Sequence, residues 1–386
     1  MSISEDLKAE AYSLGFCLFG ISLVAPPAHL AVYENWLAAG QHAGMRYLEK
    51  DRARQKRAHP ELILPDGRFF LSLAIRYPAP EANPPGNSGN PSGRVAAYAW
   101  GEDYHQVVLL RLEQLMLRLQ HMLGHPFLWR SYTDTGPILE RDFAQSSGLG
   151  WIGKNTCLIN PSHGSYFFLA EVFLAIELQP DPPFGDDRCG TCQRCIQACP
   201  TQCILPNRTI DSSRCISYLT IENKGAIPIG LRSSLGNWVF GCDICQIACP
   251  WNSRFTQTGY ELLFLQRPGI AYPSLKQDLH LTPQQFNQKF HNSPIQRARR
   301  RGYLRNVAVA LGNSGDLAAV EDLALALEHE PEPLVRSHIA WALGRIAGQA
   351  AHTALEKALK KEPDTSVLQE IHLAIEQNPI SGRKNH

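Results

Sequence analysis

Two runs of closely spaced cysteines constrain this 386-residue chain more than any other feature. Both runs space their cysteines by two or three residues and end in Cys-Pro, and an eighth cysteine lies between them. Thiolates at such short spacing can converge on one iron–sulfur cubane. The eight cysteines are Cys189, Cys192, Cys195 and Cys199 in the first run, Cys215 between the runs, and Cys242, Cys245 and Cys249 in the second.

The first run has the ligand spacing of bacterial two-cluster ferredoxins, C-x2-C-x2-C-x3-C-P. In those proteins the fourth cysteine of a run binds the other cluster. The same exchange predicts one [4Fe-4S] cluster held by Cys189, Cys192, Cys195 and Cys249. It predicts a second cluster held by Cys199, Cys215, Cys242 and Cys245. Each cluster then has four ligands, and the chain is predicted to transfer electrons.

Structural zinc and disulfide pairing are the alternatives for these cysteines. Zinc sites usually combine two CxxC pairs, sometimes with histidine, and neither run contains a histidine. Disulfides need an oxidising compartment, and the start of the chain lacks the pattern of a secretory signal. The longest apolar stretch, Tyr166–Leu178, is too short to span a bilayer and contains Glu171. We therefore expect a cytoplasmic protein with no membrane segment, in which Cys17, Cys157 and Cys203 are spare thiols.

The pattern along the chain predicts three domains and a linker. Residues 1–180 alternate short apolar runs with amphipathic segments, which is typical of a mixed α/β (α+β) domain. Residues 181–255 carry the cysteines and are expected to form a ferredoxin-like domain, in which metal ligation replaces much of the core. Residues 256–295 are expected to be a linker, and residues 296–386 to be all-α. We expect strands at 16–24, 67–77, 127–132 and 165–178, and helices at 4–14, 102–123 and 138–147.

The last region repeats with a period of 32 residues. Val307-Ala-Val-Ala-Leu-Gly312 aligns with Ile339-Ala-Trp-Ala-Leu-Gly344, and leucine pairs further along recur at the same offset. Paired helices joined by a turn, at about this period, are typical of HEAT-type repeats. An ordinary helical bundle is the alternative, but an offset that holds at several points favours repeats.

Five arginines lie within nine residues at the start of this region, from Arg297 to Arg305. In one continuous helix, Arg297, Arg301 and Arg305 would line one side and could contact a phosphate backbone. A solvated basic face is the alternative. Overall charge does not decide between them, because 37 Lys and Arg nearly balance 36 Asp and Glu.

Several segments of the chain resemble the epoxyqueuosine reductase family. Two of them are Asp134-Thr-Gly-Pro-Ile-Leu-Glu-Arg141 and Gly148-Leu-Gly-Trp-Ile-Gly-Lys-Asn155. The others are Trp100-Gly-Glu-Asp-Tyr-His105, Gly164-Ser-Tyr166 and Arg214-Cys-Ile-Ser-Tyr-Leu219. The resemblance covers nearly the whole chain, since the cysteine spacing and the repeated tail follow in the same order as in the family.

The resemblance implies a cobalamin-binding α/β domain, a ferredoxin-like domain with two clusters, and HEAT-like repeats that contact tRNA. It implies an oxidoreductase that converts epoxyqueuosine to queuosine at the wobble position of tRNA. The epoxide would receive two electrons and two protons and lose its oxygen as water. The expected cofactors are two [4Fe-4S] clusters and cob(II)alamin, and the expected electron donor is a flavodoxin or a ferredoxin. We expect a monomer.

The resemblance also implies the residues of the site. Asp134 matches the family's proton donor and is expected to contact the cofactor, whereas a turn-forming Asp before Thr-Gly is the alternative. An acid that works near neutral pH needs a pKa raised by burial or by a like charge. Tyr104 and His105 are expected either to face the substrate or to belong to the following helix. The other residues expected at the cofactor are Arg57, Asn155, Leu158, Ser165, Ser217 and Asp243.

Three other functions stay open at this point. An iron–sulfur electron-transfer subunit would explain the cysteines, but it would leave the first 180 residues and the repeats without a role. A corrinoid reductive dehalogenase typically carries a twin-arginine export signal, which this start lacks, and it has no need of a basic helical tail. A nucleic-acid-binding scaffold would hold clusters that do not take up electrons.

Overall fold

The computed structural model describes residues 3–80, 90–254 and 259–377, which form two compact units. The first unit comprises Met1–Pro80, Gly101–Ser213 and Asp243–Leu265. The second comprises Glu81–Trp100, Arg214–Cys242 and Gln266–His386. One segment boundary therefore lies inside the second cysteine run. The domain limits at 180, 255 and 295 stay a prediction. The turn-forming sequence at 84–93, which predicts a surface loop, lies largely outside the described residues.

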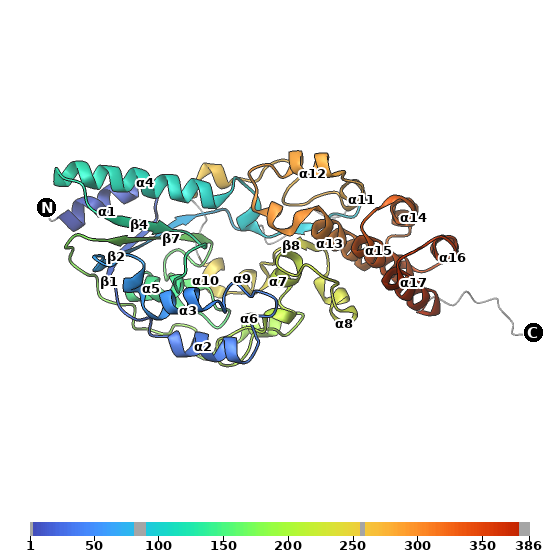
Figure 1. Ribbon diagram of the computed structural model, residues 1–386, viewed down its shortest axis with the longest axis horizontal. Helices are drawn as coiled ribbons and strands as arrows, with labels where there is room; N and C mark the ends of the chain where they lie inside the picture. Colours follow the sequence, from blue (N-terminus) through green and yellow to red (C-terminus); the bar gives the residue numbers. More distant parts are fainter. Residues whose placement is uncertain (1–2, 81–89, 255–258, 378–386) are drawn as a thin grey trace, which may run out of the picture. The chain divides into compact units, whose positions relative to one another are not determined.

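A four-stranded antiparallel sheet forms the centre of the first unit (Figure 1). The two middle strands are buried along nearly their whole length, which explains why they are continuous apolar runs. All four expected strands are present, each slightly shorter than predicted. Their order across the sheet is β1 (Leu18–Leu23), β2 (Phe69–Arg76), β7 (Phe167–Leu174) and β4 (Trp129–Tyr132).

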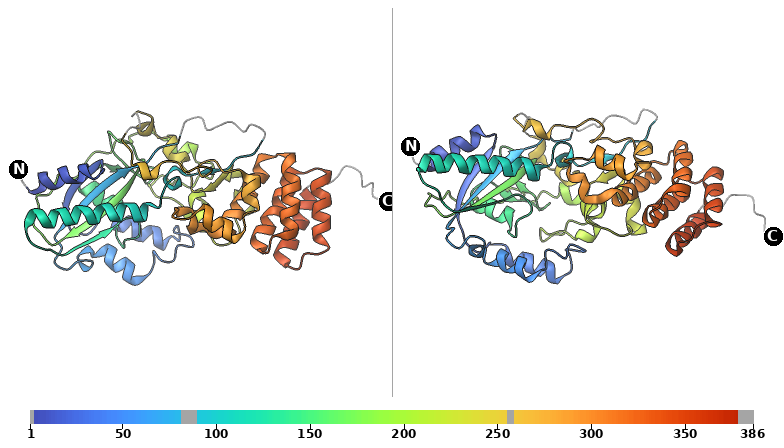
Figure 2. Two further views of the ribbon diagram at one scale, coloured as in Figure 1. Left: turned by 90° about the horizontal axis from the view of Figure 1, so that it is seen from above. Right: turned by 45° about the horizontal axis from the view of Figure 1, so that its top comes forward.

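Helices cover both faces of this sheet (Figures 1 and 2). α1 (Ile3–Ser13) and α4 (Tyr104–Leu123) pack on one face, and α5 (Glu140–Ser146) packs on the other. α4 begins after Asp103, whose side chain accepts a hydrogen bond from the backbone N–H of His105 at 3.0 Å. The same cap therefore starts the helix and fixes the backbone of His105, which belongs to the site described below.

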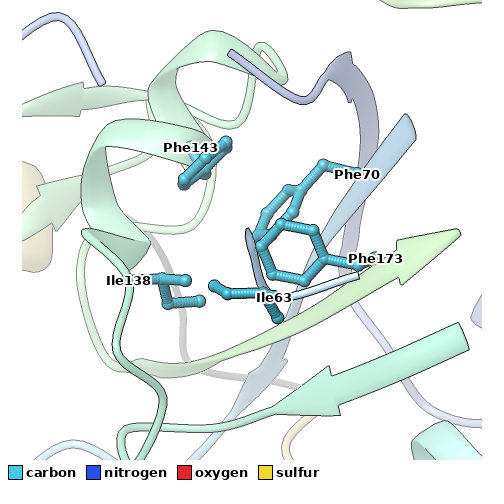
Figure 3. Packing of buried hydrophobic residues seen from close by; sticks show 5 residues of the cluster. All are labelled: Ile63, Phe70, Ile138, Phe143 and Phe173. Carbon is cyan, nitrogen blue, oxygen red and sulfur yellow. The ribbon is translucent and has the colours of Figure 1, made fainter. Parts of the chain in front are cut away.

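Aromatic packing fixes α5 on the sheet (Figure 3). Phe70 of β2 and Phe173 of β7 lie opposite each other across the strands, with ring centroids 4.8 Å apart. Phe143 of α5 stacks on Phe70 at 4.2 Å, and Ile63 and Ile138 complete the cluster. Because these side chains are almost fully buried, the first turn of α5 has a defined place beneath the sheet.

The cysteine runs fold as short helices next to a small hairpin. β5 and β6 pair antiparallel, and α6 packs against α9, so parts of the two runs lie side by side within the first unit. The remaining elements of this unit are α2 (Leu30–Ala38), α3 (Asp51–Ala58), β5 (Trp151–Ile152), β6 (Leu158–Ile159), α6 (Arg194–Ala198), α9 (Ile244–Ile247) and α10 (Pro250–Ser253).

The second unit contains the predicted helical repeats. α13, α15 and α17 pack in succession, and α14 and α16 pack alongside them (Figure 2). The five helices are α13 (Arg299–Ser314), α14 (Val320–His329), α15 (Pro333–Ile346), α16 (Gln349–Leu359) and α17 (Thr365–Gln377). A parallel pair and four short helices precede them: β3 (Arg94–Val95), β8 (Trp238–Phe240), α7 (Ile216–Ile221), α8 (Ile229–Arg232), α11 (Leu275–Leu279) and α12 (Pro283–Lys289). Short 3-10 helices occur in both units, at Pro60–Leu62, Ala97–Ala99, Ser212–Arg214, Ser233–Leu235, Leu262–Phe264, Pro294–Ala298 and Leu317–Ala319.

The 32-residue offset has a packing reason. A Cβ on Gly312 would lie 2.9 Å from the Cα of Ala342, and a Cβ on Gly344 would lie 2.8 Å from the Cα of Ala374. Both contacting alanines are themselves 32 residues apart. Only glycine lets successive helices approach this closely, so the repeat in the sequence is a repeat of helix contacts.

The arginine run does not form the single helix that the sequence suggested. A 3-10 turn ends at Ala298, and α13 begins at Arg299, whose φ is 58°. Arg297 therefore precedes the helix, where it forms a bidentate pair with Glu222 on the surface of the second unit. Arg301 is exposed on α13.

Arg305 corrects the expectation of three exposed arginines. Its side chain is fully buried. The guanidinium donates to the backbone carbonyls of Leu219, Asn223 and Gly225 at 2.6–2.8 Å. A guanidinium with these partners ties α13 to the α7 segment and is not free to bind a phosphate.

We expect Arg305→Met to destabilise the second unit by about 3 kcal/mol, because it leaves buried carbonyls without a donor. Arg301→Met is the matched control, and its exposed site should change stability by less than about 0.5 kcal/mol. Anaerobic urea unfolding followed by circular dichroism measures both. Equal stability of the two variants would contradict the structural role of Arg305.

Candidate active site

Four cysteines from both runs line one cavity of about 140 Å³ in the first unit. They are Cys189, Cys192 and Cys195 around the start of α6, and Cys249 at the start of α10. This set is the one that the ferredoxin exchange assigns to a single cluster. A [4Fe-4S] cluster needs four thiolates around one small space, and this cavity has that arrangement.

Hydrogen-bond donors surround the same cavity. The indole Nε1 of Trp151 donates to the Sγ of Cys189 at 3.4 Å. The Nζ of Lys154 donates to the carbonyls of Gly190 at 2.6 Å and Cys192 at 3.0 Å. N–H groups at the sulfurs and a nearby positive charge both stabilise the reduced state of a cluster. The surroundings therefore suit a cluster that accepts electrons.

The other four cysteines lie on both units. Cys199 follows α6 and Cys245 lies in α9, both in the first unit. Cys215 precedes α7 and Cys242 follows β8, both in the second unit. Their assignment to one cluster stays a prediction.

The three cysteines outside the predicted ligand set differ in their surroundings. All eleven cysteines lie in the described residues and are free of disulfides. Burial raises the pKa of Cys17 to about 12 and that of Cys157 to about 11, so both are neutral thiols near neutral pH. Cys203 is the buried thiol among these three. It lies 3.4 Å from Cys199, and this hydrogen bond is the main cause that lowers the pKa of Cys199 to about 5.

The described residues contain no group of three or more His, Cys, Asp or Glu side chains that could hold a single metal ion. None of the helices in these ranges combines the length and apolar content that a membrane crossing requires.

Asp134 lies at a second candidate site, in the loop between β4 and α5. Its φ is 58°, a costly conformation for a residue other than glycine and one that concentrates at functional sites. The hydroxyl of Tyr104 donates to its Oδ2 at 2.6 Å. The Nε2 of His105 lies 3.6 Å from the same oxygen, and the Nδ1 lies 2.7 Å from Asp103 Oδ1. The first turn of α4 thus presents two groups to one carboxylate.

Among the side chains around Asp134, the imidazole of His105 carries the titrating proton. Burial lowers the pKa of His105, but the hydrogen bonds with Asp103 and Asp134 outweigh it and raise that pKa to about 9. Partial desolvation raises the pKa of the Asp134 carboxyl, but its contacts with His105 and Tyr104 outweigh this effect and bring that pKa below its usual value. The structure therefore differs from the expectation of a raised pKa at Asp134: near neutral pH the carboxylate is ionised and His105 carries the proton.

We expect the His105 ring to titrate with a midpoint near pH 9 in a nuclear magnetic resonance titration. Because its folded pKa exceeds the usual 6.5, protonated His105 stabilises the loop fully below about pH 6.5 and loses this effect as the pH rises through about 9. Asp134→Asn should lower the midpoint, which stays above 6.5 because Asp103 remains. His163, whose pKa burial and Arg76 lower, is the internal control. A His105 midpoint near 6.5 that does not respond to Asp134→Asn would contradict this assignment.

The structure brings four of the six other expected cofactor residues together. Ser165 donates to Gln246 at 2.9 Å, and Gln246 approaches Asp243 at 3.5 Å. Asn155 approaches the carbonyl of Cys245 at 3.5 Å. Leu158 lies nearby on β6, in an apolar cluster with Leu149 and Phe167. All four expected residues are buried.

The other two expected cofactor residues lie on α3 and α7. Arg57, at the end of α3, is buried against the ring of Tyr33 at 5.4 Å, and its charge acts on Glu140. Ser217 lies in α7 of the second unit.

Two further residues belong to the site, although sequence reasoning gave them no role. Arg141 donates to the carbonyl of Thr156 and lowers the pKa of Asp134, so it connects the Asp134 loop with the β5–β6 hairpin. The hydroxyl of Tyr166 is buried without a partner among the described residues, and the charges of Asp243 and Cys245 act on it. Both lie in segments that resemble the family, which was the available signal.

Three family models match the chain. The model described as "4Fe-4S double cluster binding domain" matches residues 188–252. The model "Epoxyqueuosine reductase QueG, DUF1730" matches residues 57–135, and "HEAT repeats" matches residues 297–376. The double-cluster, mixed α/β and HEAT-repeat predictions are thereby confirmed.

Known proteins resemble the chain along almost all of its length. The epoxyqueuosine reductase of Pseudomonas aeruginosa is 39% identical over 344 residues, which cover 89% of this chain and 94% of the relative. A crystal structure of epoxyqueuosine reductase with an epoxyqueuosine-modified tRNA-Tyr stem loop has a TM-score of 0.89 and 31% identity, covering 97% of this chain and 98% of that one. A structure of the Bacillus subtilis enzyme, with its catalytic aspartate loop swung out of the active site, has a TM-score of 0.86 and 30% identity over 97% and 98% of the two chains.

Proposed function

The chain belongs to the epoxyqueuosine reductase family, and from that premise we propose that it reduces epoxyqueuosine to queuosine at the wobble position of tRNA. The epoxide gains two electrons and two protons, and its oxygen leaves as water. The observation that carries the proposal is the match over 97% of the chain to an enzyme solved with an epoxyqueuosine-modified stem loop. The cluster cavity and the Asp134 site supply the electron and proton carriers that this reaction needs.

Electrons enter through the two [4Fe-4S] clusters of the double-cluster domain. Cys189, Cys192, Cys195 and Cys249 hold one cluster, and Cys199, Cys215, Cys242 and Cys245 hold the other. Each cluster carries one electron at a time. An external low-potential donor, a flavodoxin or a ferredoxin, refills them.

Cobalamin is the proposed cofactor of the first unit, and when bound it supplies a cobalt centre that passes electrons to organic substrates. Asn155, Leu158, Ser165 and Asp243 would hold it, with Arg57 and Ser217 as further contacts. The buried Tyr166 hydroxyl, unpartnered among the described residues, supports a bound polar group beside Ser165. None of the six proposed contacts is a histidine, and the chain lacks the Asp-x-His-x-x-Gly sequence of a cobalt ligand.

Asp134 is the proposed proton donor to the leaving oxygen. The side chain of Asp134 is 64% exposed, against 32% for that of His105. A substrate can therefore reach the Asp134 carboxyl more easily than the His105 ring. His105 holds the proton and passes it to Asp134 when the 3.6 Å gap between them closes in the substrate complex. Tyr104 orients the accepting oxygen through its 2.6 Å hydrogen bond.

The HEAT-like repeats are the proposed tRNA-contacting part of the second unit. Arg297 and Arg301 are exposed and remain candidates for phosphate contacts. Arg305 is not among them, because its guanidinium is buried against backbone carbonyls. We propose a monomer that works in the cytoplasm, where its tRNA substrate is found.

One reaction tests the function. Purified protein with both clusters is reduced, mixed with cobalamin and tRNA from cells blocked at this step, and the tRNA is digested and analysed for queuosine. Queuosine should form only when the protein, the reductant and cobalamin are all present. Conversion without cobalamin, or no spectral change when cobalamin is titrated into apoprotein with intact clusters, would reject this cofactor. No conversion under any condition would reject the function.

A further inference from the structure

Two glutamates with buried carboxyl oxygens lie beside the Asp134 loop, and the steps described above give neither of them a task. Glu171 lies in the middle of β7 with 0% of its surface exposed, and neither carboxyl oxygen has a hydrogen-bond partner among the described residues. Glu140 starts α5, and its buried Oε1 likewise has no partner there. The carboxyl group of Glu140 also accepts the backbone N–H of Asp134. It therefore touches the loop that carries the proposed proton donor.

The strand register places both carboxyl groups on one side of the sheet. Glu171 lies opposite Ser72 of β2 and Tyr132 of β4. Side chains two residues apart on a strand share a face, so Glu171 lies on the same face as Phe173, which packs against α5. Glu140 is the first residue of that helix, and its charge acts on Glu171. The two carboxyl groups thus share the space between the sheet and α5.

Burial with a single hydrogen-bond donor for the two carboxyl groups keeps this pair protonated. An ionised carboxylate with no hydrogen-bond donor is strongly disfavoured inside a protein. Burial, and next the charge of Asp134, raise the pKa of Glu140 to about 8, although Arg141 and Arg57 oppose the shift. Burial, Glu140 and Asp134 raise the pKa of Glu171 well above its usual value. Near neutral pH the pair therefore stores protons, while Asp134 is ionised.

The reaction needs one proton more than the Asp134 site holds. His105 carries one proton, and Asp134 carries none. Opening the epoxide breaks one C–O bond and leaves an alkoxide, which takes the first proton. Breaking the second C–O bond releases the oxygen as water with the second proton. The clusters supply the two electrons, so the sum is epoxide plus two electrons and two protons to alkene plus water.

We propose that Glu140 and Glu171 are a buried proton store that reloads Asp134 with the second proton of each turnover. Glu140, in contact with the Asp134 loop, is the link, and Glu171 behind it is the source. Solvent refills the pair between turnovers. This inference rests on the proposed function, since it assigns the origin of a proton that the proposed reaction consumes.

Glu171→Gln and Glu140→Gln test the proposal in the cluster- and cobalamin-loaded, pre-reduced protein. Glutamine keeps the size of each side chain and removes the titrating proton, and at position 140 it keeps an oxygen that can accept the N–H of Asp134. We expect Glu171→Gln to slow single-turnover queuosine formation about tenfold above pH 8. At about pH 6 the rate should lie within about twofold of the unaltered protein, because solvent protons reach the exposed Asp134 directly. A purely structural defect would slow the reaction equally at both pH values.

Infrared spectroscopy gives a readout that does not depend on turnover. The substrate-free protein should show the carbonyl stretch of protonated carboxylic acids near neutral pH, and each variant should lose part of that band. Rates equal to those of the unaltered protein at every pH, a pH-independent defect in both variants, or no carboxylic acid band would each overturn the proton store.

Should Glu171→Gln fail to fold, Glu140→Gln gives the same readouts. If the unaltered protein forms no queuosine, the proposed function fails, while the infrared band still reports on the pair.

Discussion

Cys249→Ala is expected to remove one of the two iron–sulfur clusters and to abolish queuosine formation. Cys249 lines the same cavity as three cysteines of the other run, so its loss leaves that cubane with three ligands. Iron in anaerobically prepared protein should fall from about eight to about four atoms per chain. Because a two-electron reduction cannot be completed through a broken electron path, activity should fall at least about 100-fold. Iron and sulfide analysis, paramagnetic resonance of the reduced protein and the queuosine assay measure these changes.

Double variants test the exchange of ligands between the runs. Cys195→Ala combined with Cys249→Ala should lose no more iron than either change alone, since both residues are assigned to one cluster. Cys199→Ala combined with Cys249→Ala should lose the iron of both. Cys157→Ala is the control. Cys157 is a half-buried neutral thiol outside the ligand set, so this variant should keep about eight irons. Half the iron in the control, or full iron in Cys249→Ala, would contradict the assignment.

Asp134→Asn is expected to slow epoxide reduction by about 10²–10⁴-fold, the usual contribution of a general acid. The amide keeps the shape of the side chain and can still meet Tyr104, but it cannot pass on the proton held by His105. Affinity for an epoxyqueuosine stem loop should change little, because the effect lies in the chemical step. Single-turnover rates of the pre-reduced, cobalamin-bound protein, together with stem-loop binding, separate the two quantities.

Tyr104→Phe and Asp103→Asn are matched controls for that result. Each keeps the carboxyl of Asp134. Tyr104→Phe removes the hydrogen bond that Asp134 accepts, and Asp103→Asn removes the negative charge beside His105. Loss of the Tyr104 bond removes a contact that lowers the pKa of Asp134, so the acid should stay functional and the rate should drop by less than about tenfold. Unchanged turnover by Asp134→Asn, or an equal loss in all three variants, would contradict the role of Asp134 as the proton donor.

Features that depend on local spacing could be predicted from the sequence. The gaps between the cysteines assign Cys249 to the first run before any fold is known, and the structure places it in their cavity. The apolar runs that became β2 and β7 were recognisable because both faces of each strand are buried. The 32-residue offset was recognisable because Gly312 and Gly344 make the same close contact.

Features that depend on tertiary contacts could not be predicted. An arginine in a basic run shows no sign that it will be buried, and Arg305 is buried because α7 and the turn after it supply carbonyls from about 80 residues away. The low pKa of Asp134 arises from Tyr104 and His105, which precede it by about 30 residues. Glu171 lies in an apolar stretch, and the sequence does not indicate whether its carboxyl group will have a hydrogen-bond partner in the fold.

The relation between electrons consumed and queuosine formed tests the central claim most directly. The reduced, cobalamin-loaded protein is given a measured amount of a low-potential donor and an excess of epoxyqueuosine stem loop, and donor oxidation and queuosine are quantified in the same sample. We predict that the unaltered protein consumes two electrons for each queuosine formed. With Cys249→Ala, the substrate should take up no electrons and no queuosine should form. Donor oxidation without queuosine, or queuosine formed at an undiminished rate by Cys249→Ala, would contradict a cluster-fed reduction of the epoxide.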